Sequence, residues 1–506
     1  MNSRLAQTLF RLTALLVSLA VTLLLAEVAI RILDGYALWP IQLKAKTTVA
    51  ATAAPGDDQL ALRYARDVAP ATHVDAAWYA EDPPPIAPHA IMPWVEKRLE
   101  QPGNETRLFE FNRLFLADRI CRDVATTMFG NQEEFLYFDP PGTSIYPSYR
   151  QLRRLSAPGW FTTNSFGYRG PDVSLDKPAN TIRIAFVGAS TTIGAFDFPF
   201  SFPELIGHWL NRWAEARGSS VRIEVINAAR TGIDSHSIAA IVRDELLPLE
   251  PDLVVYYAAN QFWPPGSIGY RLGRLYSRPD AALASRAPAA ARSALGLRLR
   301  GMIEAWRGGD GSEPVKPIQW LRMPGVDEAH PDSRDKNLPV ELPDIVADLS
   351  SIHDALSGAG SELVLTSFSW MAKDGMKLDL PRQLRLFNHL NRDYWPATYD
   401  SMRRLADIQN RVYQDFAQRR HLPFIDFAAK FPLDTNLFVD AVHLDYPATR
   451  LQSWVIFQDL ARLIDERIEK KQLPRAMAHP GRRHPAFEQE SPRTITRQAV
   501  LAGCKC

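Results

Sequence analysis

The chain has 506 residues, with 58 Lys and Arg against 57 Asp and Glu and a formal net charge of +1 at pH 7. Hydrophobic residues make up 46% and charged residues 23% of the sequence, as in an ordinary globular protein, and the balanced charge gives no reason to expect nucleic acid as a partner. Three cysteines cannot build a disulfide framework, and without a Cys/His cluster the sequence predicts no metal and no other cofactor.

The first feature along the chain is an apolar stretch from Leu12 to Ile30, whose only charged residue is Glu27. As a helix it would rise roughly 28 Å, about the thickness of the hydrocarbon core of a bilayer. Arg4 and Arg11 precede it, and arginines flanking such a helix stay on the cytoplasmic side. The sequence therefore predicts a signal-anchor over residues 1–33 of a single-pass inner (plasma) membrane protein, with the rest of the chain periplasmic. A cleaved signal peptide is the alternative.

A region of different composition follows the apolar stretch. Residues 34–90 are rich in Ala, Pro, Thr and Asp, a composition typical of an extended stalk. The following residues carry more aromatic side chains, which favours packing against the next domain. We expect residues 34–155 to form a stalk and a lead-in or cap region.

From residue 156 to residue 470 the sequence alternates short apolar runs with segments of helical periodicity. The predicted strands are residues 182–187, 221–226, 252–257, 362–367 and 423–427, and the predicted helices are residues 202–217, 236–248, 342–357, 400–420 and 447–470. This alternation predicts an α/β domain with a parallel sheet covered on both faces. Residues 264–340 interrupt it as an insertion, and the basic segment 471–506 is predicted to be a disordered tail.

The residues with the clearest chemical meaning are a serine and an Asp/His pair. Ser190 lies in a glycine-containing turn directly after the apolar run 182–187, where an α/β sheet presents a nucleophile. The structural alternative is that Ser190 caps the N-terminus of the helix that follows. His443 can act as a general base, and Asp440, three residues earlier, can orient its ring, while Asp445 is a rival carboxylate. The three together favour a serine nucleophile.

These residues, with Asn164-Ser165-Phe166-Gly167-Tyr168-Arg169-Gly170 ahead of them, resemble the SGNH (GDSL-like) hydrolase superfamily, in particular its membrane-anchored bacterial members. The resemblance implies a flavodoxin-like three-layer α/β/α fold with a central parallel sheet. It also implies that Ser190 is the nucleophile and that Asp440 and His443 complete a catalytic triad. The chain departs from the family pattern with Gly-Ala-Ser-Thr at the first block and Ala-Ala-Asn-Gln at the third.

The same resemblance implies an oxyanion hole. Gly232 matches the glycine of the second block and Asn260 the asparagine of the third. The backbone N–H groups of Ser190 and Gly232 and the side-chain amide of Asn260 would then donate to the oxygen that becomes negatively charged in the transition state. A turn with positive φ at Gly232 and a loop asparagine bonded to its own backbone at Asn260 are the structural alternatives.

Aromatic residues beyond the predicted strand ends are candidates for substrate contact, although aromatic residues at a sheet edge belong to the core as often. These residues are Phe262, Trp263, Phe368 and Trp370. The resemblance implies a carboxylic-ester (O-acyl) hydrolase. An extracytoplasmic, membrane-tethered position suits an acylated glycan or another envelope polymer as its substrate. An O-acyltransferase onto an envelope polysaccharide and a non-catalytic glycan-binding assembly component are the alternatives.

Overall fold

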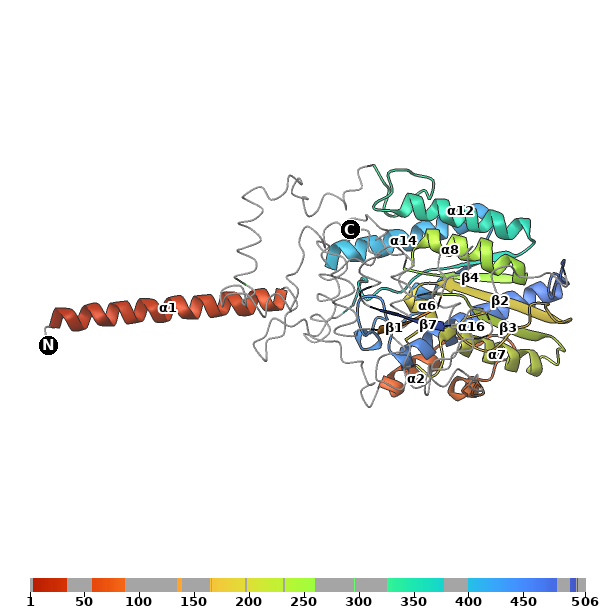
Figure 1. Cartoon of the computed structure of the whole chain (residues 1–506), viewed down its shortest axis with the longest axis horizontal. Coiled ribbons are helices and arrows are strands. Elements are labelled where there is room, and N and C mark those ends of the chain that lie inside the picture. The colour runs from red at the N-terminus through yellow and green to blue at the C-terminus, as the bar shows by residue number, and fades with distance from the viewer. Residues whose placement is uncertain are drawn as a thin grey trace.

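The central element of the protein is a five-stranded parallel sheet with strand order β3-β2-β4-β5-β6 (Figure 1). The computed structural model describes residues 3–33, 57–86, 134–138, 164, 166–195, 198–230, 233–259, 295, 325–376, 399–479, 492–496 and 498. The strands are β2 (Thr181–Gly188), β3 (Arg222–Asn227), β4 (Leu253–Tyr257), β5 (Glu362–Thr366) and β6 (Phe424–Ile425).

The two central strands, β2 and β4, are buried along their whole length, which explains why each is a nearly continuous apolar run. Ile184 of β2 lies opposite Val225 of β3 on one side and Leu253 of β4 on the other, both in parallel register. The chain leaves β2 toward β3 and then crosses back to β4, so the strand order reverses between β2 and β4. Open α/β sheets bind ligands at the carboxyl end of such a switch point.

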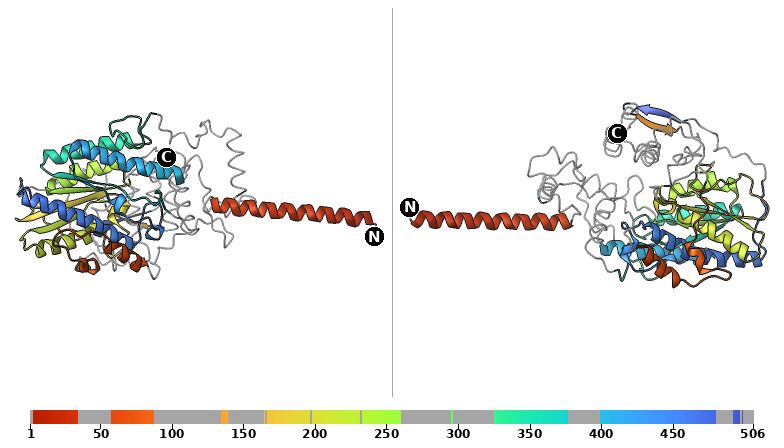
Figure 2. Two further views of the ribbon diagram at one scale, coloured as in Figure 1. Left: turned by 180° about the vertical axis from the view of Figure 1, so that it is seen from behind. Right: turned by 90° about the horizontal axis from the view of Figure 1, so that it is seen from below.

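Helices cover both faces of the sheet, as two opposite views show (Figure 2). One face carries α8 (Ser235–Ile241), α12 (Leu342–Gly358) and α14 (Tyr399–Arg420), and the other carries α7 (Phe202–Ala216) and α16 (Tyr446–Glu469). The shorter elements are α6 (Ser190–Ile193), η3 (Val242–Leu246), η4 (Leu247–Leu249), α15 (Phe427–Lys430) and η7 (Thr435–Leu437). This arrangement confirms the predicted three-layer α/β/α fold with a central parallel sheet.

Residues 57–86 differ from the predicted stalk because they pack against the outer helical layer. They contain α2 (Asp57–Arg66) and η1 (Ala76–Ala80). Trp78 and Tyr79 are buried, and the Tyr79 ring lies 5.6 Å from that of Trp454 in α16. Arg450 of α16 donates a 2.5 Å hydrogen bond to the Tyr79 carbonyl. The Ala/Pro/Asp-rich composition indicates a stalk, but Trp78 and Tyr79 within it are part of the core.

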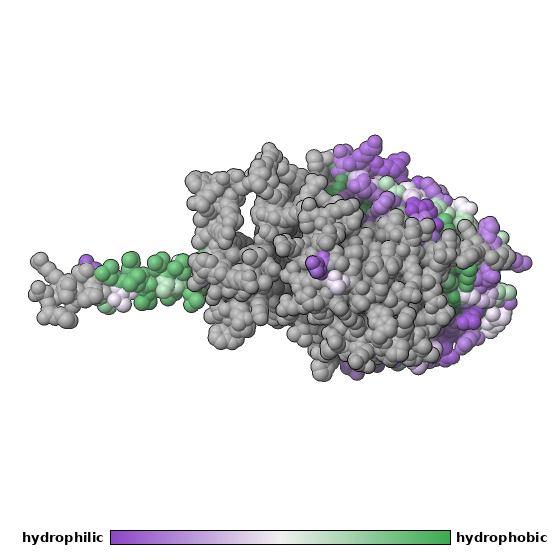
Figure 3. Space-filling model, in the orientation of Figure 1, coloured by the Kyte–Doolittle hydropathy of each residue, from purple (hydrophilic) through white to green (hydrophobic). Residues whose placement is uncertain are grey.

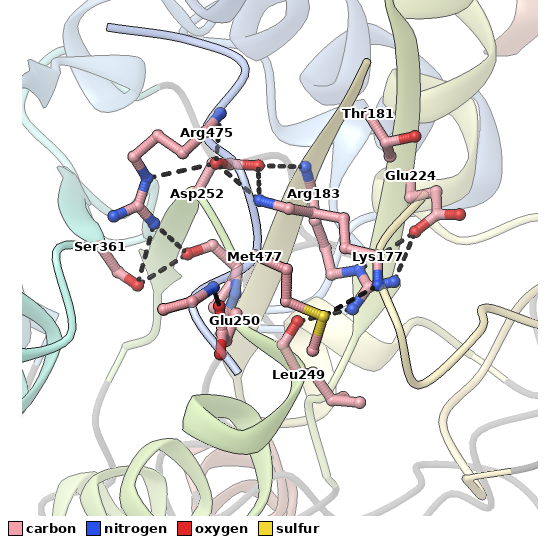
Figure 4. Close-up of polar contacts among 12 residues, drawn as sticks. Lys177, Thr181, Arg183, Glu224, Leu249, Glu250, Asp252, Ser361, Arg475 and Met477 are labelled. Atoms are coloured by element: carbon pink, nitrogen blue, oxygen red, sulfur yellow. Dashed lines mark hydrogen bonds and ion pairs between the residues drawn. The ribbon is translucent and has the colours of Figure 1, made fainter. Parts of the chain in front are cut away.

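The start of the predicted disordered tail also lies against the domain. Residues 471–479 contact the amino end of the sheet, where Arg475 Nε lies 3.2 Å from an Asp252 oxygen (Figure 4). The backbone N–H of Ala478 donates to Glu250. Further along, β7 (Pro492–Thr496) pairs antiparallel with β1 (Glu134–Phe138). For these stretches the structure differs from the predicted disorder: acidic groups distant in sequence bind residues 475–479, and strand pairing orders residues 492–496.

The first helix, α1 (Ser3–Leu33), extends away from the α/β body and exposes an apolar surface (Figure 3). Its segment Phe10–Ile30 has a mean hydropathy of 2.3 with none of it buried. Length and composition suit a membrane anchor or a signal sequence. The carboxylate of Glu27, the single charged group between Leu12 and Ile30, accepts a 2.9 Å hydrogen bond from the Leu295 N–H.

Candidate active site

Ser190 lies at the carboxyl edge of the sheet, next to the switch point between β2 and β4. Strand β2 ends at Gly188 and α6 begins at Ser190. The N-cap of α6 is Ala189, whose side chain makes no capping hydrogen bond. Ser190 is therefore the first residue inside the helix and not its N-cap, and its hydroxyl lies against His443 instead.

Ser190, His443 and Asp440 form a continuous chain of hydrogen bonds. Ser190 Oγ lies 2.8 Å from His443 Nε2. His443 Nδ1 lies 2.8 Å and 3.0 Å from the two carboxylate oxygens of Asp440. A carboxylate beside Nδ1 favours the tautomer with the proton on Nδ1, which leaves Nε2 free to accept the serine proton. The structure thus brings together the three residues predicted to be catalytic, which lie 253 positions apart in sequence at their widest.

The backbone fixes Asp440 in this orientation. Its Oδ1 accepts hydrogen bonds from the N–H groups of His443 at 2.8 Å and Val442 at 2.9 Å, so the pair shares one tight turn. The rival carboxylate, Asp445, has a different role: it caps α16 by accepting a 2.9 Å hydrogen bond from the Ala448 N–H. Of these two carboxylates, Asp440 is the partner of His443.

Four of the other predicted site residues are not described by the structure. Gly232, Asn260, Phe262 and Trp263 lie outside the described residues, so the second and third oxyanion donors and the first aromatic pair stay predictions.

The second aromatic pair, Phe368 and Trp370, belongs to the core and not to a substrate surface. Each side chain is 1% exposed. The Phe368 ring lies 4.8 Å from that of Tyr257, and Trp370 Nε1 donates to Gln409 Oε1 at 3.2 Å. The Phe368 N–H donates to Asn410 Oδ1 at 2.8 Å, so the segment after β5 is bonded to α14 through both residues. Of the two alternatives for this pair, the structure therefore supports the core placement.

Gly188 permits the close approach that shapes the nucleophile turn. The Thr192 hydroxyl passes over it to donate a 2.6 Å hydrogen bond to the carbonyl of Tyr257 at the end of β4. A Cβ at position 188 would lie 2.1 Å from both the Thr192 hydroxyl and the Tyr257 carbonyl oxygen. Only glycine fits there. This steric requirement explains the glycine ahead of the serine in the sequence motif.

Gly188→Ala is therefore expected to lower the free energy of unfolding by about 3 kcal/mol or more, because a backbone carbonyl must move to admit the methyl group. Urea denaturation followed by circular dichroism measures this. The matched control is Gly358→Ala at the end of α12, where an added Cβ meets nothing within 4 Å. That change should be neutral or slightly stabilising. Equal losses in both variants would contradict the steric explanation.

A cluster of acidic residues lies where α8 and α12 begin. Asp234 caps α8, and Glu341 occupies the N-cap position of α12. Burial raises the pKa of Glu341 to about 8, and the negative charges of Asp344 and Asp234 add to the shift. Among the described residues, no group of three or more His, Cys, Asp or Glu side chains is arranged to hold a metal ion.

The raised pKa of Glu341 makes a stability prediction with a definite sign. The folded-state pKa of about 8 exceeds the ordinary value of 4.5. The contribution of this carboxyl to the free energy of unfolding is therefore fully present below pH 4.5 and is lost as the pH rises through 8. Glu341→Gln should remove this loss and stabilise the protein at pH 9 by about 2 kcal/mol relative to the unsubstituted chain, with little difference at pH 4. This is less than the full shift would give, because the side chain is only partly buried and solvent screens its charge. Urea unfolding at both pH values tests it. A constant difference across pH would contradict it.

No protein-family model and no curated protein matches the sequence. Among solved structures, the chain is similar to Axe2, an acetylxylan esterase from Geobacillus stearothermophilus, with 14% identity, coverage of 55% of this chain and 94% of that one, and a TM-score of 0.30. It is also similar to a GDSL-like lipase from Bacteroides thetaiotaomicron, with 13% identity, coverage of 59% and 93%, and a TM-score of 0.28. Values this low transfer neither substrate nor reaction. The fold therefore rests on the strand order and the two helical layers of this chain itself.

Proposed function

We propose that the protein is a serine-dependent carboxylic-ester hydrolase of the SGNH type. The observation that carries the proposal is the chain of contacts from Ser190 Oγ through His443 to Asp440, with 2.8 Å separations at both links. A serine hydroxyl is a weak nucleophile until a base removes its proton, and this geometry supplies the base and the group that orients it.

The reaction can be written from these contacts. Ser190 Oγ attacks the acyl carbonyl while its proton passes to His443 Nε2, and the negative charge of Asp440 stabilises the imidazolium that forms. The proton then moves to the leaving alcohol oxygen as the C–O bond breaks, which leaves an acyl-enzyme. Water attacks that ester with His443 again as the base, and the carboxylic acid departs. The N–H groups of Ser190 and Gly232 and the Asn260 amide are the proposed donors to the tetrahedral oxyanion.

The alternatives differ in the fate of the acyl-enzyme. An O-acyltransferase would form the same intermediate and pass the acyl group to a glycan hydroxyl in place of water. A non-catalytic glycan-binding component has no need for a carboxylate that orients a histidine toward a serine hydroxyl, so the triad geometry favours a catalyst.

The decisive assay uses the full chain in detergent with a short-chain aryl ester. A hydrolase releases the aryl alcohol at a rate that an added glycan acceptor leaves unchanged. An increase in that rate with acceptor, together with an acylated glycan as product, would favour the transferase. No turnover with any acceptor by a folded sample would end both catalytic proposals.

The proposed location is the outer face of the plasma membrane, with α1 as the anchor and an acylated glycan or envelope polymer as the substrate. The apolar segment Phe10–Ile30 supports this. We expect the protein to sediment with membranes, and a reporter that is active only outside the cytoplasm should give signal when it is fused after residue 470. A soluble mature protein that begins near Ile30 would replace the anchor with a cleaved signal peptide.

A further inference from the structure

We propose that Arg169, in the loop formed by residues 164–170, is a positioning residue that holds the nucleophile turn in place. The proposal rests on the proposed function of Ser190 and adds a second group on which its reactivity depends. The sequence motif contains this arginine without indicating its role.

The Arg169 guanidinium is buried and bonded to the chain that directly follows Ser190. The residue is 2% exposed. Its Nη1 donates to the carbonyls of Ile193 at 3.0 Å and Ala195 at 2.8 Å, and its Nη2 donates to the carbonyl of Phe198 at 2.7 Å. All three acceptors lie within eight residues of the nucleophile. A single side chain therefore fixes the path by which the chain leaves the active-site turn.

Helix α6 needs such support because it is too short to be stable alone. It spans the four residues Ser190–Ile193, and a single helical turn fixes more backbone angles than it gains in hydrogen bonds. The carbonyls at its end have no partner within the helix. Arg169 supplies that partner at Ile193. Gly194 follows with φ of 79°, and a Cβ there would lie 3.2 Å from Arg169 Nη1, so the chain bends closely around the guanidinium.

The guanidinium is itself anchored to the rigid helical layer. Arg169 Nε lies 3.2 Å from Glu204 Oε2, and both side chains are nearly inaccessible to solvent. The same Glu204 oxygen accepts from the N–H and the hydroxyl of Ser201, which forms the capping box of α7. Asn227, at the end of β3, donates to Ser201 Oγ at 3.1 Å and to the Thr192 carbonyl at 3.2 Å. The turn is thus tied to α7 and β3 through buried groups.

The loop that carries Arg169 is preorganised and also contacts the buried ion pair of Glu245 and Arg230. Asn164 Oδ1 accepts hydrogen bonds from the N–H groups of Phe166 at 2.9 Å and Tyr168 at 3.1 Å. The Tyr168 hydroxyl donates to Glu245 Oε2 at 3.2 Å, and the same oxygen accepts from Arg230 Nη2 at 2.5 Å. Arg230 lies two residues before Gly232 in the sequence. Through this shared acceptor the loop is linked to Arg230, a second residue at the carboxyl end of the sheet.

Lysine cannot replace Arg169 in this role. A planar guanidinium reaches three carbonyls and a carboxylate along fixed directions, whereas an ammonium is a compact point charge with three donors. A nucleophile displaced by about 1 Å can lose about 100-fold in rate. We expect Arg169→Lys and Arg169→Ala to lower kcat about 100-fold on an aryl ester, with KM changed less than threefold.

The experiment compares these variants with Lys177→Met in the full chain. Lys177 forms an equally buried ion pair with Asp252, but at the amino end of the sheet, away from Ser190. The Lys177→Met change should destabilise the fold without displacing Ser190, so it controls for an effect of stability alone. Three readouts separate positioning from folding: the pH profile of kcat/KM, recovery of the Arg169→Ala variant with added guanidinium ion, and deuterium exchange of the peptide covering residues 189–200.

The proposal predicts that the midpoint of the pH profile of kcat/KM is unchanged, because the His443–Asp440 contact is untouched. Guanidinium ion should restore the kcat of Arg169→Ala at least tenfold. Deuterium exchange of residues 189–200 should be faster in the Arg169 variants only. Wild-type kcat and exchange in folded Arg169 variants, or an equal loss of kcat in Lys177→Met, would overturn it. If the unsubstituted chain hydrolyses no ester, the proposed function fails, and the exchange comparison still decides whether Arg169 holds the turn.

Discussion

Ser190→Ala is expected to lower kcat for a short-chain aryl ester by about 10⁶-fold, to the level left by binding and oxyanion stabilisation alone. The reason is chemical: without Oγ no acyl-enzyme forms, and His443 has no serine proton to accept. KM should change little, because the hydroxyl contributes to the transition state far more than to ground-state binding. Steady-state assays with enzyme concentrations high enough to detect residual turnover measure the loss.

Two companion variants make the result specific. Asp440→Asn keeps the shape of the site but favours the wrong tautomer of His443, and should cost about 10⁴-fold in kcat. Ser350→Ala removes a hydroxyl that donates to the Val346 carbonyl within α12, and should leave kcat unchanged. Retention of more than a hundredth of the wild-type kcat by folded Ser190→Ala would remove Ser190 from the mechanism.

Asp252→Asn is expected to lower the free energy of unfolding by about 3–5 kcal/mol, because it leaves a buried ammonium without its charge partner. The Asp252 carboxylate is inaccessible to solvent and lies 2.9 Å and 3.0 Å from Lys177 Nζ. It also accepts from the Arg183 N–H at 2.7 Å and contacts Arg475 Nε at 3.2 Å. An amide of the same shape turns one acceptor into a donor, which must then face another donor.

Urea unfolding of the full chain measures this loss, and a double-variant cycle tests its cause. Adding Lys177→Met to Asp252→Asn should recover part of the stability, since the buried charge is then gone. Asp332→Asn removes a carboxylate from an exposed pair with Arg334 and should shift the midpoint little. Equal destabilisation by the two single aspartate changes would contradict the importance of burial.

The parts of the fold that the sequence predicts well are those whose pattern is local. The pattern predicts strand β2 (Thr181–Gly188) at 182–187 and helix α16 (Tyr446–Glu469) at 447–470, because a fully buried parallel strand is a continuous apolar run and a long helix keeps its period. The Asp440/His443 pair is predictable for the same reason: its three-residue spacing fits one turn of chain.

Contacts between segments distant in sequence could not be predicted in this way. The composition of residues 57–86 indicates a stalk, yet Trp78 and Tyr79 are buried, and the Tyr79 ring packs against α7 and α16, more than a hundred residues away. Phe368 follows a strand end just as a substrate-binding aromatic would, and only the packing of the three layers shows that it is buried. The role of Arg169 is likewise visible only in its contacts with the chain after Ser190.

Covalent labelling tests the central claim most directly. The full chain is treated with a serine-directed fluorophosphonate, digested, and analysed by peptide mass spectrometry, with Ser190→Ala and His443→Ala treated alongside. We predict one adduct per chain, on Ser190, absent in Ser190→Ala and formed at least a hundredfold more slowly in His443→Ala, because the histidine activates the hydroxyl from 2.8 Å. A folded protein that stays unlabelled, or that carries the adduct on another residue, would contradict the account.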